Sequence, residues 1–205
     1  MAFEALELEL KQQGYKYICG VDEAGRGPLA APVFAAAVIL KGDAVLEGLN
    51  DSKKLTEKKR EELYDKIISQ SIAYSIMYVD EKTIDEINIL NATMGAMKAA
   101  VNSLKIKPNA ALIDGNKAPQ LDVGLVRCEI KGDARIKSIA AASVLAKVAR
   151  DRYMMELDKK YPQYQFSKHK GYGTKLHYEM LDLYGVSDVH RMSFLKKYFE
   201  GKKNA

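Results

Sequence analysis

Four acidic residues follow short apolar runs of the sequence, where strands are expected to end. Asp22 and Glu23 are adjacent at the end of the first run, and Asp114 and Asp133 each lie beside a glycine after later runs. In open α/β sheets, ligands bind in the crevice beyond the strand ends, so acids from distant parts of a chain can converge there. Carboxylate oxygens suit Mg²⁺ or Mn²⁺, whereas zinc favours histidine or cysteine. The pattern therefore favours a divalent-cation site.

Each acid has a simpler explanation when it is considered alone. Asp133 could cap the long helix that follows it, Asp114 could belong to a turn, and Asp22 could simply end a strand. The adjacent pair Asp22 and Glu23 favours a functional site, because two neighbouring carboxylates in an apolar region are costly unless a cation or hydrogen bonds compensate them.

The hydrophobic pattern predicts five strands that bring these acids to one place. Two apolar runs, at 17–21 and 33–40, are typical of paired central strands. Residues 71–79 alternate larger and smaller side chains, which fits a third strand. Buried strands are also expected at 110–113 and 125–130. Strands followed by helices, then two strands and more helices, predict an α/β domain with a mixed sheet.

Helical spacing predicts the elements between these strands. Phe3, Leu6 and Leu10 indicate a short N-terminal helix, and Thr56 is a plausible N-cap. Further helices are predicted at 56–69, at 83–104 as one or two pieces, at about 135–160 and at 174–184. We expect a single domain over residues 1–205, with a helical arm at 1–14 and a C-terminal helical segment at 174–205.

Composition limits the classes of protein. Lys and Arg outnumber Asp and Glu by 32 to 27, a formal charge of +5, which permits a nucleic-acid partner without requiring one. No apolar run approaches the ~20 residues that span a bilayer, and a secretory signal is absent, so we expect a cytoplasmic protein with no membrane contact. Cys19 and Cys128 lie in apolar runs without CxxC spacing, and both are predicted to be core thiols. A monomer is expected.

The segment GVDEAGRGPLAAPVFAAAVIL at residues 20–40 resembles the opening signature of type II ribonucleases H. Six further segments match the family's motifs in the same order: NDSKKL at 50–55, NILNAT at 88–93, LIDGN at 112–116, KGDARIKSIAAASVLAKVARDRYM at 131–154, HKGYGT at 169–174 and HRMSF at 190–194. The resemblance covers nearly the whole chain. Type III relatives carry an additional N-terminal domain, so the short segment before Asp22 favours type II.

The resemblance implies a ribonuclease H-like fold, with a five-stranded mixed sheet flanked by helices, and a metal site formed by Asp22, Glu23, Asp114 and Asp133. Two cations about 4 Å apart can activate a nucleophile, stabilise the transition state and assist the leaving oxygen. We hypothesise that Asp22 and Asp114 hold Mg²⁺ or Mn²⁺ against the scissile phosphate and that Glu23 and Asp133 complete the site. The RNA strand of an RNA/DNA hybrid would be cut to leave 3′-hydroxyl and 5′-phosphate ends.

Residues for substrate recognition are also implied by the resemblance. Gly25, Arg26 and Gly27 follow the acidic pair, and glycines there let main-chain groups approach a nucleic-acid backbone. In the family this segment reads the ribose 2′-hydroxyl, which distinguishes RNA from DNA. Tyr172, within HKGYGT, would lie beside the same nucleotide in a duplex that carries one ribonucleotide. From the residues alone, a loop tyrosine anchored to the core is a fair alternative. The implied role is removal of ribonucleotides from DNA, with contact to a replication clamp left open.

A basic track could extend this surface. Ser143, Lys147 and Arg150 recur at i, i+4 and i+7 along the long helix, a stripe that could contact phosphates. Other basic residues of the expected loops could join it: Lys53, Lys54, Lys168, Lys170 and Arg191. Each one alone is typical of a solvated surface, so the prediction concerns the group, with Lys53 and Lys147 ranked first. The three histidines, His169, His177 and His190, rank below the carboxylates, and His177 is expected to be structural.

Two alternatives are open at this point. A junction resolvase or integrase-like nuclease would share the carboxylates but not the Gly-Arg-Gly and tyrosine pair. A non-catalytic hybrid-binding module is disfavoured by the four acids, because negative charge facing phosphates weakens binding.

Overall fold

The computed structural model describes residues 5–203 of the chain, and its centre is a mixed five-stranded sheet. In chain order the strands are β1 (Ile18–Ala24), β2 (Val33–Leu40), β3 (Ser71–Val79), β4 (Ala110–Asp114) and β5 (Leu125–Glu129). Their order across the sheet is β3-β2-β1-β4-β5. The pairs β1–β2 and β2–β3 are antiparallel, whereas β1–β4 and β4–β5 are parallel. The prediction of a mixed sheet is confirmed, and β1 continues through the acidic pair.

Helices connect and cover these strands. They are α1 (Ala5–Gln12), α2 (Glu57–Ser69), α3 (Glu81–Asn102), α4 (Lys137–Lys160), α5 (Phe166–His169), α6 (Lys175–Tyr184) and α7 (Lys196–Lys203), with short 3-10 turns η1 (Ser52–Lys54), η2 (Gly132–Ala134), η3 (Pro162–Tyr164) and η4 (Met192–Phe194). Thr56 caps α2 as predicted, since its hydroxyl accepts the amide N–H of Lys59. Phe3, assigned to the first helix from its spacing, lies outside the described residues.

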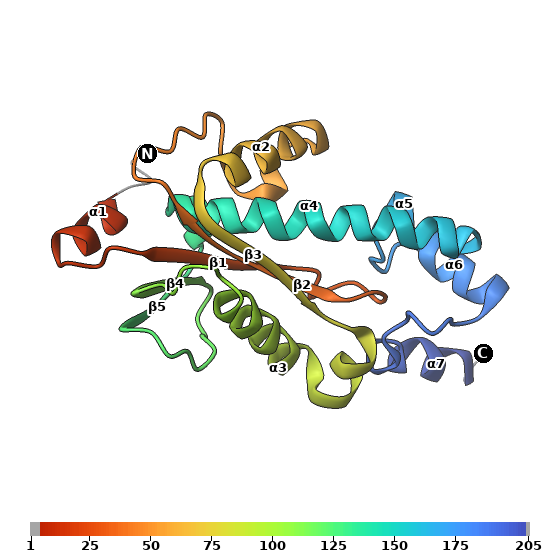
Figure 1. Ribbon diagram of the computed structural model, residues 1–205. Helices are drawn as coiled ribbons and strands as arrows, with labels where there is room; N and C mark the ends of the chain where they lie inside the picture. Colours follow the sequence, from red (N-terminus) through yellow and green to blue (C-terminus); the bar gives the residue numbers. More distant parts are fainter. Residues whose placement is uncertain (1–4, 204–205) are drawn as a thin grey trace.

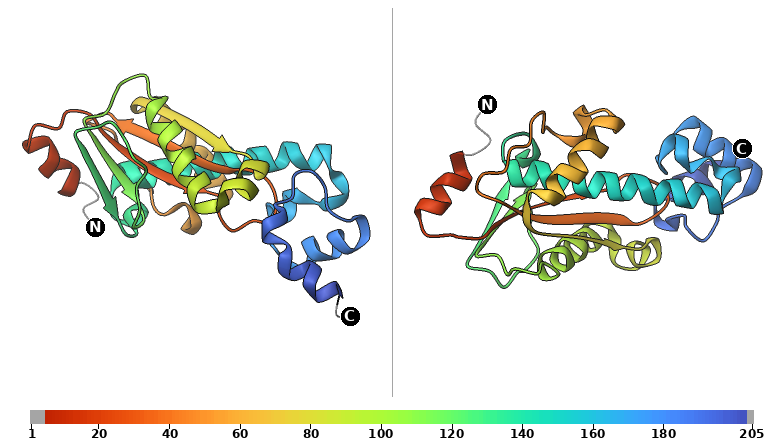
Figure 2. Two further views of the ribbon diagram at one scale, coloured as in Figure 1. Left: turned by 90° about the horizontal axis from the view of Figure 1, so that it is seen from below. Right: turned by 45° about the horizontal axis from the view of Figure 1, so that its top comes forward.

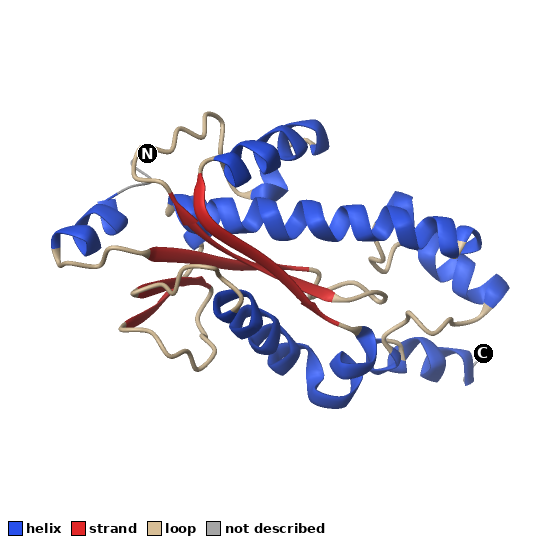
Figure 3. Ribbon diagram, viewed as in Figure 1, coloured by secondary structure: helices blue, strands red, loops and turns tan. Residues whose placement is uncertain are grey.

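The two faces of the sheet are covered by different helices (Figure 1). In Figure 3, α2 and α4 lie on one side of the strands and α3 lies on the other. Alternation along β2 separates the two layers: Ala35, Ala37 and Ile39 pack into the core with α3, whereas Ala36 and Val38 pack with α2 and α4. Side chains of a strand point alternately to its two faces, so even-numbered residues of β2 face α4.

Gly20 of β1 is the point where α4 lies against the sheet. A Cβ atom on Gly20 would lie 2.1 Å from the carbonyl carbon of Ser138. Only a residue without a side chain permits this approach. The contact places the first turns of α4 directly behind the carboxyl end of β1, where the acids lie.

The helix α1 and the C-terminal helices lie at opposite ends of the elongated molecule, as both views in Figure 2 show. Residues Leu29, Met154, Phe166 and Leu181 belong to one buried apolar cluster. The loop after β1 is therefore packed against the far end of α4 and against α5 and α6. This packing brings the segment after the acidic pair to the C-terminal part of the chain.

The two cysteines differ from the prediction that both are core thiols. Cys19 is fully buried in β1, but Cys128 is exposed. The correction follows from topology, because β5 is an edge strand and its apolar pattern does not require burial on both faces. Among residues 5–203, no helix has the length and apolar character needed to cross a bilayer.

Candidate functional site

Strand register places Asp22 and Asp114 side by side. The parallel pair β1–β4 aligns Val21 with Ile113, and each aspartate is the next residue of its strand. Neighbouring strands lie about 4.8 Å apart, so the two carboxylates project from adjacent strand ends. Gly20 of β1 lies against α4 and Leu112 of β4 packs with Ile139 of α4, so the aspartates two residues further along each strand face α4 as well. Convergence of these two acids is thus a direct consequence of topology.

Asp133 reaches the same place through the turn η2 rather than through a strand. The carboxylate oxygen Oδ1 of Asp114 accepts the amide N–H groups of Gly132, at 2.8 Å, and Asp133, at 3.4 Å. One carboxylate oxygen each from Asp22, Asp114 and Asp133 lie within 4.8 Å of one another. The helix α4 begins after Ile136, so the alternative that Asp133 caps that helix is wrong.

Glu23 lies beside this trio but is not a member of it. Its Oε1 is 3.4 Å from Nη1 of Arg26. Its main-chain N–H donates to Oδ1 of Asp22 at 2.7 Å, which helps to orient that carboxylate.

Burial and neighbouring acids raise the pKa values of Asp22, Glu23 and Asp133. Burial, followed by the charges of Glu23 and Asp114, raises the pKa of Asp22 well above its ordinary value. Burial also raises the pKa of Glu23, with Arg26 opposing the shift. For Asp133, burial and then Asp114 raise the pKa. A cluster that resists carrying its full negative charge is the electrostatic setting in which a divalent cation binds favourably.

The donor set fits a hard cation. All three clustered ligands are carboxylate oxygens, which suit Mg²⁺ or Mn²⁺. Lys53 is the nearby basic side chain: partial burial opposes its charge, but Asp51, Asp22, Asp133 and Asp114 together raise its pKa. Lys53 therefore stays charged beside the acids, where it can attract a phosphate.

Two buried arginines, Arg150 and Arg191, contact the loop after β1. Gly25 has φ +98°, and a Cβ atom there would lie 2.2 Å from Nε of Arg150, so glycine is required on both counts. Arg191 is fully buried and donates to carbonyl oxygens of this loop, including Gly25 at 2.7 Å and Arg26 at 3.1 Å. Arg26 and Gly27 themselves are exposed.

Tyr172 lies at the same surface as this loop. A Cβ atom on Gly27 would be 3.6 Å from Cε1 of Tyr172, and the tyrosine is 45% exposed. The guanidinium of Arg150 is 6.0 Å from the ring centroid. The ring is thus an exposed face next to two exposed main-chain positions, not a side chain buried in the core.

The stripe on α4 points inward instead of toward solvent. Ser143 is buried, hydrogen-bonds Asp22, and lies 2.9 Å from Oγ of Ser52. Arg150 is 1% exposed and donates to main-chain carbonyls, among them Lys170 at 3.0 Å. These two side chains therefore support the site from behind and present no polar group to a phosphate. The spacing predicts that these residues share one helix face, and in the structure Ser143 and Arg150 of that face contact other segments of the chain rather than solvent.

The remaining basic residues divide into surface and core groups. Lys147 pairs with Asp151 at 2.6 Å and is partly buried. Lys53, Lys54 and Lys168 are exposed and Lys170 is partly exposed. The prediction that Arg191 is a loop charge on a basic track is wrong, because its guanidinium is buried and fully engaged with carbonyls.

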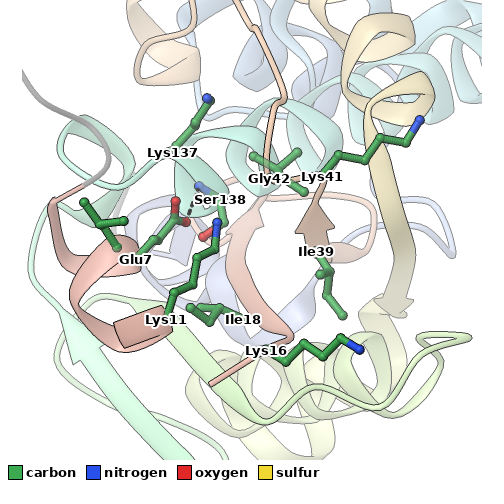
Figure 4. Close-up of a pocket in the computed structure, with 11 residues that line it drawn as sticks. Glu7, Lys11, Lys16, Ile18, Ile39, Lys41, Gly42, Lys137 and Ser138 are labelled. Carbon is green, nitrogen blue, oxygen red and sulfur yellow. Dashed lines mark hydrogen bonds between the residues drawn. The ribbon is translucent and has the colours of Figure 1, made fainter. Parts of the chain in front are cut away.

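A separate small cavity lies away from the carboxylates (Figure 4). It has a volume of about 120 Å³ and is lined by Glu7 of α1 and Ser138 of α4 among others. Oε1 of Glu7 accepts the main-chain N–H of Ser138 at 3.0 Å. Because the first turn of a helix has unpaired N–H groups, Glu7 caps α4 from a distant part of the chain. No capping motif precedes α4 in sequence, so spacing alone does not reveal this residue.

Carboxylates gathered beyond two parallel strands of a mixed sheet, with a helix packed behind them, define a metal-dependent nuclease with a ribonuclease H-like fold. Residues 19–197 match the family model described as Ribonuclease HII. The chain is 59% identical over 191 residues to ribonuclease HII of Caldicellulosiruptor bescii, covering 93% of this chain and 92% of that protein. It is 56% identical over 192 residues to that of Acetivibrio thermocellus, covering 94% and 75%. The chain belongs to the ribonuclease HII family.

Solved structures agree with this assignment. The ribonuclease H2 of Pyrococcus horikoshii OT3 gives a TM-score of 0.72 at 28% identity, covering 92% of this chain and 100% of that chain. A ribonuclease HIII, Bst-RNase HIII in complex with Mn²⁺, gives a TM-score of 0.69 at 16% identity, over 97% of this chain and 74% of that one, and shows the common fold. The family membership makes the protein a nuclease with ribonuclease H activity. It decides against both the resolvase-like enzyme and the non-catalytic binding module.

Proposed function

We propose that this enzyme cuts the RNA strand of RNA/DNA hybrids and also cuts duplex DNA 5′ to a single embedded ribonucleotide, leaving 3′-hydroxyl and 5′-phosphate ends. The observation that carries the proposal is the carboxylate trio, within 4.8 Å, beside the exposed positions of Arg26, Gly27 and Tyr172. Acids facing a phosphate backbone would oppose binding unless cations lie between them. The arrangement therefore favours hydrolysis over passive binding.

In this proposal Asp22, Asp114 and Asp133 hold Mg²⁺ or Mn²⁺, with two ions in the substrate complex, and Glu23 completes the site. The bound cations would stabilise charge in the transition state and help to activate the attacking water. The chain contributes preorganised ligands, because the amide N–H groups of Gly132 and Glu23 fix the orientation of the Asp114 and Asp22 carboxylates. Ligands fixed before substrate arrives require no reorganisation during the reaction.

The loops supply substrate recognition in the same proposal. Gly25, Arg26 and Gly27 offer main-chain groups to the ribose, and the Tyr172 ring stacks on the deoxyribose that follows. Lys53 attracts the backbone near the acids, and Lys147 contributes more weakly because it is already paired with Asp151. Phosphate contacts position a duplex, whereas contact with the 2′-hydroxyl distinguishes RNA from DNA.

The test is digestion of an end-labelled DNA duplex that carries one ribonucleotide, with Mg²⁺, with Mn²⁺ and with EDTA. We expect metal-dependent cleavage on the 5′ side of the ribonucleotide and no cleavage of the all-DNA control. Extension of the labelled fragment by a polymerase distinguishes a 3′-hydroxyl end, which is extended, from a 3′-phosphate end, which is not. Cleavage of the uniform hybrid without cleavage at the single ribonucleotide would contradict the finer substrate assignment.

The biological role that we propose is excision of ribonucleotides from DNA. One similar structure, at 27% identity and a TM-score of 0.70 over 86% of this chain and 94% of that chain, is the PCNA:RNase HII complex from Archaeoglobus fulgidus. That complex is the reason to test this chain for binding to a replication clamp by titration calorimetry. Size-exclusion chromatography with light scattering tests the proposed monomer.

A further inference from the structure

Three buried histidines form a cluster next to the Tyr172 loop. The rings of His169 and His177 are stacked, with centroids 4.3 Å apart. Nε2 of His177 lies 3.1 Å from Nε2 of His190. Nδ1 of His177 lies 3.0 Å from the carbonyl oxygen of Tyr172. The chain of contacts thus runs from His190 through His177 to the main chain of Tyr172.

The partners of these rings determine where each proton lies. Nδ1 of His190 accepts the main-chain N–H of Ser187 at 3.0 Å, and a main-chain N–H can only donate. The proton of neutral His190 is therefore on Nε2, which donates to Nε2 of His177. Nε2 of His177 is then an acceptor, so its proton is on Nδ1 and is donated to the Tyr172 carbonyl. Burial lowers the pKa of both His177 and His190 to about 4, which keeps both rings neutral near pH 7.

Arg191, the next residue after His190, holds the segment at residues 25–31, which we call the recognition loop. Its five hydrogen bonds all go to carbonyl oxygens of residues 25–31: Gly25 at 2.7 Å, Arg26 at 3.1 Å, Pro28 at 2.9 Å, and Ala31 at 2.8 and 2.6 Å. A guanidinium has five N–H groups, so all of them are used. Burial lowers the pKa of Arg191 to about 9, which leaves it charged at neutral pH.

This arrangement determines which way the loop amides point. In a trans peptide the C=O of one residue and the N–H of the next point in opposite directions. Because the carbonyls of Gly25 and Arg26 turn toward Arg191, the N–H groups of Arg26 and Gly27 turn away from it. Within the described part of the chain, neither of these two N–H groups has a hydrogen-bond acceptor. They are free donors at exposed positions.

Main-chain bonds join the same segments. The N–H of Arg191 donates to the carbonyl of Leu29, and the N–H of Leu29 donates to the carbonyl of Gly171, each at 2.8 Å. Ala30 and His190 form an isolated antiparallel bridge. The recognition loop therefore lies between the His190–Arg191 segment and the residue before Tyr172.

We propose that the His190–Arg191 dipeptide is a positioning element that sets the spacing between the Tyr172 ring and the amide donors of Arg26 and Gly27, and so sets the preference for a single ribonucleotide over a continuous hybrid. His190 acts on Tyr172 through His177, and Arg191 acts on the other loop directly. Neither residue touches the substrate. The inference rests on the proposed function for its substrates, but its structural half can be tested independently.

The structural half is tested by histidine NMR on the ¹⁵N-labelled, full-length, metal-free enzyme at neutral pH. Long-range ¹H–¹⁵N correlations should show the proton on Nε2 of His190 and on Nδ1 of His177. His169 should carry its proton on Nε2, since its Nδ1 accepts the N–H of Gly171 and its Nε2 faces the carbonyl of Tyr164. A proton on Nε2 of His177 would overturn the proposal, because no hydrogen bond would then reach Tyr172.

The functional half compares kcat/KM on a duplex with one ribonucleotide and on a uniform RNA/DNA hybrid. His190→Leu removes the donor and should lower the ratio of the two values by about tenfold, the effect of about 1.4 kcal/mol. His190→Gln can place an N–H near the same position and should keep the ratio within about threefold. Arg191→Lys retains the charge but cannot reach all four carbonyls. It should raise KM on both substrates, because both contain the ribose, and it should also lower the ratio, because the amide donors are no longer held at a fixed spacing from Tyr172.

Leu63→Ala is the control, because Leu63 is fully buried in a different apolar cluster, which contains no residue of either loop. It should lower thermal stability and leave the substrate ratio unchanged. If His190→Leu lowers both activities equally, like a loss of folded protein, the positioning role is overturned. If His190→Leu does not fold, the glutamine variant and the wild-type NMR decide. If the wild type fails to cut at a single ribonucleotide, the proposed function is wrong. The proton positions on His177 and His190 then still test whether these rings hold the Tyr172 main chain.

Discussion

Neutralising one acid of the trio should make the metal-free enzyme more stable while it destroys activity. We consider Asp114→Asn, because Asn retains an oxygen that can accept the N–H groups of Gly132 and Asp133. The substitution thus removes charge and keeps the local hydrogen bonds. Loss of several kcal/mol of transition-state stabilisation corresponds to a decrease in kcat of about 10² or more.

The stability gain follows from the separation of the charges. Oxygens of the trio lie within 4.8 Å of one another, and two unit charges at that distance repel by about 3.5 kcal/mol with an effective dielectric constant of about 20. Partial protonation of Asp22, whose pKa is raised by burial and by its neighbours, already relieves part of this repulsion. We therefore expect a gain of about 1 to 3 kcal/mol, or about 3 to 9 °C in Tm for a chain of this length.

The gain should depend on pH with a definite sign. Burial and neighbouring acids raise the pKa values of Asp22, Glu23 and Asp133 in the folded state. As pH rises from the ordinary carboxyl range, the unfolded chain loses these protons first, so stability decreases until the folded groups have also titrated. The wild type should lose more stability than Asp114→Asn as pH rises above the ordinary carboxyl range of about 4.

Differential scanning calorimetry in EDTA and in Mn²⁺ measures both effects. In EDTA the variant should melt above the wild type, and Mn²⁺ should raise the Tm of the wild type more, because a ligand stabilises the state that binds it. Asp122→Asn, at an exposed ion pair with Lys107, is the control and should change neither Tm nor activity. A variant that melts below the wild type in EDTA, or that gains as much Tm from Mn²⁺, would refute the charge-cluster reasoning.

Three other substitutions test separate parts of the structure. Lys53→Gln should raise KM and reduce its dependence on salt, whereas Lys54→Gln, in the same short turn, should do neither; equal salt dependence in both variants contradicts a role for Lys53. Tyr172→Ala should lower cleavage at a single ribonucleotide by about 10-fold to 100-fold relative to a long hybrid, as loss of about 1 to 3 kcal/mol of stacking would, with little change in Tm; a uniform loss on both substrates argues against stacking at the junction. Glu7→Ala should cost about 1 kcal/mol in urea unfolding and spare kcat, while Glu7→Gln keeps an acceptor for Ser138 and should cost less; no difference between them would show that the cap is unimportant.

The sheet and its acids could be predicted because local pattern and topology agree. Apolar runs mark the strands, and the position of Asp22 and Asp114 at the ends of two of them is enough to expect that they meet. Glu23 enters the predicted metal site through the family resemblance, on a motif that places it directly after Asp22. Adjacent residues of a strand point to opposite faces, which explains why Glu23 lies beside the cluster and pairs with Arg26.

The stripe on α4 shows where pattern stops being informative. Spacing places Ser143, Lys147 and Arg150 on one helix face, but it does not say what that face packs against. A polar face is expected to meet solvent. Here Ser143 instead contacts Ser52, and Arg150 lies against carbonyls of Ala30, Pro32 and Lys170. The partners of Arg150, such as the carbonyl of Lys170, are main-chain groups. Every residue has such a group, so the sequence does not show which ones Arg150 will contact.

The same argument explains why Arg191 and His190 could not be assigned from sequence. A buried arginine is costly unless its charge and all its donors are satisfied, and the usual signal would be a nearby acid. The donors of Arg191 are satisfied by carbonyl oxygens more than 150 positions earlier in the chain, at Gly25 to Ala31. Because those carbonyls turn inward, the amides of Arg26 and Gly27 turn outward with partial positive charge. A nucleic-acid backbone bound there, as we propose, would meet donors rather than acceptors. In the proposed positioning role, the burial of one cation in the C-terminal part of the chain would therefore prepare the exposed Gly-Arg-Gly segment to bind a ribose phosphate.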